Sequence, residues 1–171
     1  ISGGSFLFFS PQFGSEPKSN IKNYFETLDN YSNGEFKNQE SFVLMTGEMS
    51  MAKFISNDNV IKKPNNIIPN TVSFEKFKNF PNDKIQFFWL GHSAFLLKIK
   101  NKIIMLDPML GKYASPIPIP TLKRYSLELA ISLDEIDSID LVIFSHDHYD
   151  HLDYKTIKKI KNKVKMFCVP L

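Results

Sequence analysis

Three of the chain's four histidines lie in the run SHDHYDH at residues 145–151. Histidine is the commonest metal ligand in proteins, and carboxylates complete sites built from nitrogen and oxygen donors. His146 and His148 can project to the same side and chelate one ion, and Asp150 with His151 can chelate a second. Two ions about 3.5–4 Å apart could share a hydroxide and stabilise both the attacking and the leaving oxygen of a displacement. A single zinc site and a solvated loop are the alternatives, and four donors at this spacing favour the pair of ions.

Apolar runs on either side of this loop predict the elements that position it. Residues 141–144 (LVIF) have the length and the continuous apolar character of a strand buried on both faces. Asp153 is expected to cap a helix that reaches Val164, and residues 165–171 (KMFCVPL) are expected to form a second buried strand. Strand, loop, helix and strand in this order predict a βαβ unit and an α/β architecture. Ligand sites in such sheets form at the carboxyl ends of strands, where the histidine run begins.

Two polar residues upstream also follow predicted strands. Apolar runs with strand character lie at residues 85–90, 95–99 and 102–106, the last two joined by a tight turn. His92 follows the first of these strands and Asp107 follows the last. A buried carboxylate is costly unless it is paired, so Asp107 is expected to hydrogen-bond a backbone turn or to orient a ligand.

The composition is that of one soluble globular domain. The chain has 171 residues, of which 43% are hydrophobic and 23% charged, a balance unlike that of disordered proteins. Its net charge of +3 comes without a clustered basic patch, which argues against nucleic acid as a partner. The one cysteine, Cys168, can form no internal disulfide, and its apolar neighbours predict a buried, inert thiol.

The character of the sequence changes at about residue 84. Residues 1–83 show little regular period and are predicted to be an N-terminal extension, whereas residues 84–171 are predicted to be the functional domain. The apolar run FLFF at residues 6–9 is much shorter than the ~20 residues of a membrane helix. It is either a short core segment or the remnant of a removed anchor or signal sequence.

The motifs of the second region resemble those of a known family. In chain order they are WLGHS (89–93), LDP (106–108), ASP (114–116), KRY (123–125), IDLVIFSHDHYDHLDY (139–154) and VPL (169–171). The histidine motif is similar to that of the metallo-β-lactamase superfamily. The whole series is similar to the branch of N-acyl-phosphatidylethanolamine-hydrolysing phospholipase D and its bacterial relatives. The resemblance covers residues 84–171 well and reaches the PQFG of residues 11–14 more weakly.

The resemblance implies a metal site with two zinc ions. His146 and His148 would bind the first ion, and Asp150 and His151 would bind the second. Asp150 would also orient the attacking hydroxide, which makes it the expected catalytic residue. In the family, two further histidines and a bridging aspartate complete the site, and they come from the second half of the domain. This sequence has no histidine after His151.

Three other residues would lie around the metals or the substrate. The resemblance places His92 at the rim, where we expect it to support a metal ligand or contact substrate rather than make a purely structural hydrogen bond. Asp107 would orient a ligand. Arg124 is the only arginine of the chain and suits bidentate contact with phosphate, although a solvated Lys123-Arg124 loop pair is an equal alternative.

The fold implied by the resemblance is the N-terminal half of a metallo-β-lactamase αββα sandwich, preceded by the N-terminal extension. The chain is therefore expected to be a fragment of a larger unit. The missing ligands would lie in a longer native chain or in a second chain that completes the domain. Such a half would expose a strand edge and an apolar face, which favours association.

The implied function is zinc-dependent hydrolysis of a phosphodiester in N-acylated phospholipids, of the phospholipase D type, by attack of a metal-bound hydroxide. A lactonase or another hydrolase on the same metals is the alternative, because one fold hosts several chemistries. The alternative of another class is a non-catalytic binding or structural half-domain with an incomplete metal site. A phospholipid or another small molecule is the expected substrate, the membrane surface is a further candidate partner, and the location, membrane-associated or cytoplasmic, stays open.

Overall fold

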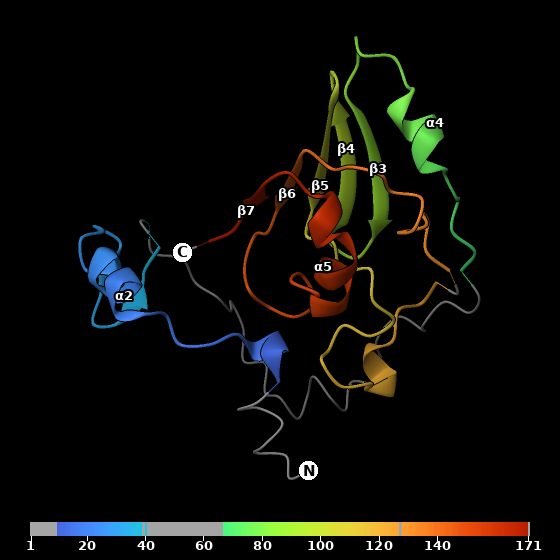
Figure 1. The fold of residues 1–171 in the computed structure, drawn as a ribbon. Coiled ribbons are helices and arrows are strands. Elements are labelled where there is room, and N and C mark those ends of the chain that lie inside the picture. Colours follow the sequence, from blue (N-terminus) through green and yellow to red (C-terminus); the bar gives the residue numbers. More distant parts are fainter. Residues whose placement is uncertain (1–9, 39, 41–66, 127, 171) are drawn as a thin grey trace. The chain divides into compact units, whose positions relative to one another are not determined.

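The computed structural model of the protein describes residues 10–38, 40, 67–126 and 128–170. The chain divides into two compact units, residues 1–62 with residue 171, and residues 63–170 (Figure 1). No helix in the described ranges is long and apolar enough to cross a membrane.

The first unit contains short helices and a small hairpin. Its described elements are η1 (Pro11–Phe13), α2 (Ser19–Phe25), β1 (Tyr31–Ser32) and β2 (Glu35–Phe36). The two strands pair antiparallel across a turn in which Asn33 and Gly34 both have positive φ, as a tight hairpin turn requires. The Phe25 ring lies 4.9 Å from the Phe36 ring, between centroids, and so joins the helix to the hairpin.

The second unit is built on a five-stranded mixed sheet (Figure 1). In spatial order its strands are β3 (Gln86–Gly91), β4 (Ala94–Ile99), β5 (Lys102–Leu106), β6 (Leu141–Ile143) and β7 (Phe167–Cys168). The first three strands are antiparallel neighbours, whereas β5 with β6 and β6 with β7 are parallel pairs. The remaining elements are α4 (Phe74–Lys78), η2 (Pro120–Leu122), α5 (Tyr154–Ile160) and η3 (Lys161–Lys163). Because β6, α5 and β7 form a parallel crossover, the predicted βαβ unit and α/β fold are confirmed.

One face of the sheet carries the hydrophobic core. In β4 the side chains alternate, so that Ala94 and Leu96 are completely buried while their neighbours are half-buried. Phe74 and Phe77 of α4 and Ile160 of α5 belong to the same buried cluster. The core therefore lies between the sheet and these two helices, and it holds rigid the strands whose ends carry the polar residues.

A buried lysine fastens α4 to the sheet. The Lys98 side chain is 4% exposed, and its Nζ atom donates hydrogen bonds to the carbonyls of Lys78, at 2.6 Å, and of Phe80. Carbonyls at the end of a helix lack partners within the helix, and a cation satisfies them well. The segment around α4 thus packs with the sheet, although it precedes residue 84. The expected domain boundary at residues 83 and 84 stays a prediction, and the compact unit begins at residue 63.

The two edge strands are more exposed than their apolar sequences predict. Both residues of β7, Phe167 and Cys168, are exposed, so the prediction of a buried strand with a buried cysteine was wrong. At the opposite edge, Phe87 and Trp89 of β3 are 67% and 60% exposed. An apolar run predicts a strand, but its burial depends on what packs beside it. In the described part of the chain β7 pairs with β6 alone.

The carboxylate of Asp140 joins β5 to the segment before β7. It accepts hydrogen bonds from Lys165 Nζ at 2.8 Å and from the Ile103 backbone N–H at 3.0 Å. These bonds outweigh burial and lower the pKa of Asp140 from 3.8 to about 2. A lowered pKa contributes stability that is fully present above the ordinary pKa and is lost as the pH falls towards the lowered one.

We therefore expect Asp140→Asn to lower the free energy of unfolding by about 1 kcal/mol at pH 6, since these ion pairs are partly exposed. The difference between the two proteins should shrink as the pH falls from 4 to 2. Urea denaturation of both proteins across this range measures it. A difference that stays constant down to pH 2 would contradict the role given to the ionised carboxylate.

Candidate metal centre

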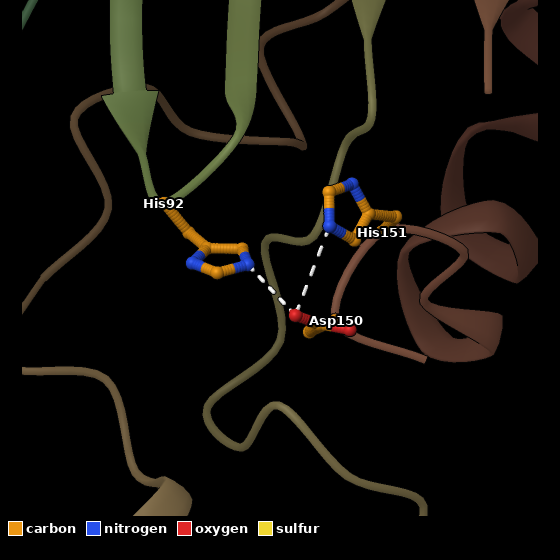
Figure 2. A group of neighbouring side chains, drawn as sticks. All are labelled: His92, Asp150 and His151. Atoms are coloured by element: carbon orange, nitrogen blue, oxygen red, sulfur yellow. Dashed lines mark hydrogen bonds and ion pairs between the residues drawn. The ribbon is translucent and has the colours of Figure 1, made fainter. Parts of the chain in front are cut away.

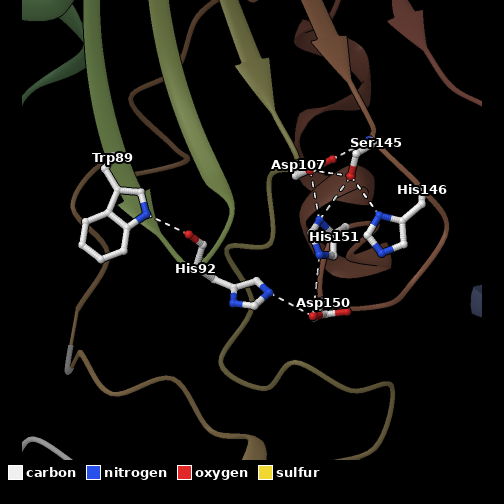
Figure 3. Close-up of polar contacts among 7 residues, drawn as sticks. All are labelled: Trp89, His92, Asp107, Ser145, His146, Asp150 and His151. Atoms are coloured by element: carbon white, nitrogen blue, oxygen red, sulfur yellow. Dashed lines mark hydrogen bonds and ion pairs between the residues drawn. The ribbon is translucent and has the colours of Figure 1, made fainter. Parts of the chain in front are cut away.

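Three strands have their carboxyl ends on the same side of the sheet, at the ends of the strands. Both β3 and β5 run antiparallel to β4, and β6 is parallel to β5, so all three end on the same side. His92 lies in the turn after β3, Asp107 follows β5, and the loop 145–151 follows β6. Figure 3 shows that polar side chains at these strand ends point toward one another. The topology of the sheet thus gathers polar residues that are far apart in the sequence.

The side chains of His92, Asp150 and His151 gather their polar atoms in one small group (Figure 2). One such atom from each residue lies within 4.8 Å of the others. Asp150 Oδ2 is 2.9 Å from His92 Nε2 and 3.8 Å from His151 Nε2. Because a carboxylate only accepts, the His92 Nε2–H group donates to Asp150. In this arrangement His92 Nε2 carries a proton and supports Asp150, whereas the Asp150 carboxylate and the His151 imidazole are ligands of the kind that suit zinc or a similar divalent ion.

Asp107 supports this group through hydrogen bonds with two residues of the histidine loop, His151 and Ser145 (Figure 3). Its Oδ2 atom accepts hydrogen bonds from His151 Nδ1 at 3.0 Å and from Ser145 Oγ at 2.7 Å. Its Oδ1 atom accepts one from the Ser145 backbone N–H at 2.7 Å. The Ser145 hydroxyl, having given its hydrogen to Asp107, accepts a hydrogen bond from His146 Nδ1 at 2.9 Å. One carboxylate is therefore linked to two of the predicted metal ligands.

This network fixes which nitrogen of each imidazole carries the proton. In neutral His151 the Nδ1 atom must be protonated to donate to Asp107, so Nε2 keeps its lone pair. The same holds for His146, whose Nδ1–H group donates to Ser145. A metal ion binds the unprotonated nitrogen, and outer hydrogen bonds of this kind orient the ring and raise its basicity. The hydrogen bonds therefore prepare both histidines as metal ligands through Nε2.

The backbone at two of these positions is in the left-handed region. His92 has a φ of 46° and Asp107 a φ of 38°, values that few residues other than glycine adopt. Hydrogen bonds stabilise this backbone conformation at both positions. Trp89 Nε1 donates to the His92 carbonyl at 2.8 Å, and the Asp107 N–H donates to the Ile143 carbonyl at 2.9 Å. Strained backbone of this kind is concentrated at functional sites.

The ionised form of Asp107 is favoured by its partners. Burial by itself raises the pKa of Asp107, but the hydrogen bonds from His151 and Ser145 outweigh burial and hold the pKa below its usual value. The side chain is 11% exposed. A carboxylate that stays charged near neutral pH keeps both histidines in the tautomers described above.

The predicted pair for the first ion is also brought together. The rings of His146 and His148 lie 4.5 Å apart between centroids, and the His146 and His151 rings lie 4.0 Å apart. His148 is exposed, whereas His146 and His151 are half-buried. The four residues predicted to bind metal thus form one continuous cluster, and His92 joins it through Asp150.

Tyr149 lies beside Asp153 and is partly buried. Burial and the neighbouring Asp153 carboxylate, which also hydrogen-bonds the phenol, raise the pKa of Tyr149 to about 12. Of the two roles that the sequence left open for this residue, contact with substrate and packing of the loop, the geometry favours packing.

Asp153 is a supporting residue whose full role the sequence did not reveal. As predicted, it caps α5, accepting a hydrogen bond from the Lys155 N–H at 3.1 Å. The carboxylate is also buried and accepts from Thr156 Oγ1 at 2.6 Å and from the Gly111 N–H at 2.8 Å. A side chain at Gly111 would place its Cβ atom 2.6 Å from Asp153 Oδ2, so only glycine fits there. Asp153 thus joins the segment after β5 to the end of the histidine loop.

Arg124 makes no hydrogen bond or ion pair with the histidines within the described residues. Its Nη1 atom donates to the Leu110 carbonyl at 3.0 Å. Burial lowers the pKa of Arg124, and the nearby Asp153 carboxylate opposes that shift. The structure therefore brings together all the predicted site residues except Arg124.

Comparison with protein families identifies the region that holds this cluster. Residues 86–167 match the family described as the beta-lactamase superfamily domain. Over 60 residues the chain is 33% identical to the UPF0173 metal-dependent hydrolase of Caldivirga maquilingensis and 36% identical to that of Hyperthermus butylicus. Each match covers 35% of this chain and 20% of the relative, so the chain spans about a fifth of the length of these relatives.

Among solved structures, the chain is similar to the isothiocyanate hydrolase from Delia radicum gut bacteria, with 18% identity, a TM-score of 0.36 and coverage of 50% of this chain and 40% of that one. It is also similar to CmlA, a diiron β-hydroxylase from Streptomyces venezuelae, with 21% identity, a TM-score of 0.34 and coverage of 51% and 15%. The phospholipase D branch stays a prediction from the motifs. The family match over residues 86–167 and the metal-dependent relatives support the metallo-β-lactamase superfamily for this region of the chain.

Proposed function

We propose that the protein to which this chain belongs is a metal-dependent hydrolase whose metal centre includes the cluster at the carboxyl ends of β3, β5 and β6. The observation that carries the proposal is the network around Asp107, which leaves Nε2 of His151 and of His146 unprotonated. A network of this kind serves a metal ligand, whereas a solvated histidine has no need of it. The metal-dependent hydrolases among the relatives agree with this assignment.

The residues present fit the two zinc ions that we propose. His146 and His148 would hold the first ion, and Asp150 and His151 the second, with His92 hydrogen-bonded to Asp150. Imidazole and carboxylate donors without thiolates suit a catalytic zinc centre. Zinc, when bound, acts as a Lewis acid that polarises phosphoryl oxygens and lowers the pKa of water. The ligands beyond this set would come from a further part of a longer chain or from a second chain.

Each residue of the cluster would then have a separate task. Asp107 holds the imidazoles of His151 and, through Ser145, of His146 in one tautomer and one orientation. His92 restrains the Asp150 carboxylate by donating to its Oδ2 atom. Asp150, the proposed catalytic residue, uses its oxygens to orient the attacking water. The chain thus supplies a prearranged set of donors, which avoids reorganisation during the reaction.

The proposed substrate is an N-acylated phospholipid. Water adds across its phosphodiester: the water oxygen bonds to phosphorus, the bond from phosphorus to the ethanolamine oxygen breaks, and that oxygen takes a proton. The products are phosphatidate and an N-acylethanolamine. An exposed apolar surface beside the site supports a lipid, since Trp89, 60% exposed, hydrogen-bonds the carbonyl of His92 and Phe87 lies two residues before it. Such a surface could also rest against a membrane.

Two measurements test this proposal. Elemental analysis of freshly purified, unchelated protein should give close to two zinc per chain, provided that the remaining ligands are supplied. The protein should also hydrolyse vesicles of N-acyl-phosphatidylethanolamine faster than any member of a panel of soluble lactones. Preference for the lactones would refute the lipid substrate but keep the hydrolase. A zinc content close to zero would mean that the metal centre does not form with this chain alone.

A further inference from the structure

A small pocket rich in positive charge lies in the long connection between β5 and β6. Its volume is about 290 Å³, and it is lined by Lys112, Lys123, Arg124, Tyr125 and Ser126. Three of these five residues are cationic, two carry hydroxyl groups, and no carboxylate lines the pocket. We propose that this pocket binds a phosphoryl group, at a site separate from the metal centre.

Backbone hydrogen bonds hold the two lysines on adjoining segments. The Arg124 N–H group donates to the Lys112 carbonyl at 3.0 Å, and the Ala114 N–H group donates to the Leu122 carbonyl at 2.9 Å. Tyr113 and Lys123 form an antiparallel bridge between these bonds. The backbone that carries these cations is therefore fixed by the fold, so that a ligand need not order it on binding.

The positive charge of the pocket is only partly neutralised by the protein. Within the described residues neither Lys112 nor Lys123 forms an ion pair, and the Lys112 ammonium lies 5.8 Å from the Tyr113 ring. Arg124 has the nearby Asp153 as its compensating charge, and its Nη1 atom donates to Leu110. A guanidinium has five N–H groups, so donors remain for a ligand in addition to that bond.

These features match a phosphoryl group better than a carboxylate. Two lysines without counter-ions complement a charge of about −2, which a phosphate monoester approaches near neutral pH. A guanidinium and hydroxyl groups can donate to its several oxygens at once, which strengthens charge-assisted hydrogen bonding. The pocket is far too small for a lipid chain to enter but has room for a headgroup phosphate or for the phosphate of a soluble ester.

The proposed phosphoryl site is separate from the metal centre that the proposed hydrolysis would use. None of the four histidines lines the pocket, so phosphoryl binding there needs no metal. Asp153 connects the two regions, because it hydrogen-bonds Gly111 next to Lys112 and ends the histidine loop. A phosphate in the pocket would thus anchor either a membrane surface or a soluble ligand close to the supports of the metal centre.

The test is an NMR titration of the full 171-residue chain with inorganic phosphate, monitored by backbone amides at constant ionic strength. The protein carries His146→Ala and His148→Ala and is kept free of metal, so that phosphate cannot report on the metal centre. We expect saturable shifts at residues 112 and 123–126. The substitutions Lys112→Gln and Lys123→Gln together should weaken binding about tenfold or more. The matched pair Lys158→Gln and Lys161→Gln, both exposed lysines elsewhere, should leave it within about twofold.

Two further arms identify the source of the phosphate. Glycerol 3-phosphate that competes with inorganic phosphate would assign the pocket to soluble esters. Binding to vesicles that contain phosphatidate, whose headgroup is a phosphate monoester, but not to vesicles with the same content of phosphatidylglycerol, a diester, would assign it to a lipid headgroup if the binding needs Lys112 and Lys123. Shifts spread over all lysines, or affinity unchanged by the double substitution in every arm, would overturn the proposal. No arm of this experiment needs metal or catalysis. A negative result would therefore refute the phosphoryl site and leave the proposed hydrolase untouched.

Discussion

Replacing His151 with alanine is expected to remove most of the bound metal and to lower hydrolysis by roughly three orders of magnitude, about 4 kcal/mol of transition-state stabilisation. The reason is its central place in the cluster. His151 Nδ1 is held by Asp107 at 3.0 Å, and its Nε2 atom lies 3.8 Å from Asp150. Its ring lies 4.0 Å from that of His146. Metal content and hydrolysis rate measured on the same preparation check both effects.

Two further variants make this prediction specific. Asp107→Asn should weaken metal binding by about 10- to 100-fold, because it disturbs the proton positions of the histidines and leaves the ligands in place. Asp147→Ala is the matched control, since Asp147 is an exposed carboxylate of the same loop and is expected to have no effect. A His151→Ala protein that keeps its full metal content would refute the role of this residue as a ligand. Equal losses in Asp147→Ala would show that any change in the loop suffices.

Replacing Asp153 with alanine is expected to lower the free energy of unfolding by about 3 kcal/mol, because several buried donors lose their acceptor together. The carboxylate is 1% exposed and accepts hydrogen bonds from the Gly111 and Lys155 N–H groups and from Thr156 Oγ1. Its removal leaves these donors without a partner and takes the cap from α5. Chemical denaturation measured by circular dichroism checks the size of the loss.

The space around Asp153 allows an independent test of the same junction. Gly111→Ala would bring a Cβ atom to 2.6 Å from Asp153 Oδ2, and it should destabilise the protein as well. The two substitutions act on one contact, so their effects should be less than additive. Asp83→Ala, in an exposed turn, is the control and should change the stability by less than about 0.5 kcal/mol. Full additivity would show that the two residues act separately.

Local patterns were enough to predict most of the elements around the site. The apolar runs at 85–90, 95–99 and 102–106 correspond to β3, β4 and β5 within one residue at each end. The predicted cap at Asp153 is confirmed, although α5 ends at Ile160 and is followed by the 3-10 turn η3. These features depend on residues that are neighbours in the sequence, such as a polar side chain before an apolar helix face. The sequence reports them directly for that reason.

Burial at the edges of the sheet could not be predicted in this way. The run around Cys168 is as apolar as a central strand, yet β7 pairs on one side only and its residues are exposed. Trp89 likewise lies in an apolar run and is 60% exposed. Whether an apolar strand is covered depends on its neighbours in space, and the period of its own residues carries no information about them.

The residue types and spacing in the loop 145–151 by themselves determined that this protein carries a candidate metal site, because imidazole and carboxylate donors so close in sequence are a local property. Only the tertiary structure decided how the site is supported. It placed His92, 58 positions away from Asp150, within 2.9 Å of its carboxylate, and it joined Asp107 to His151 across 44 positions. It also brought Tyr149 and Asp153 together. The physical reason is that hydrogen bonds between distant residues depend on strand order and direction, which arise only when the whole sheet has formed.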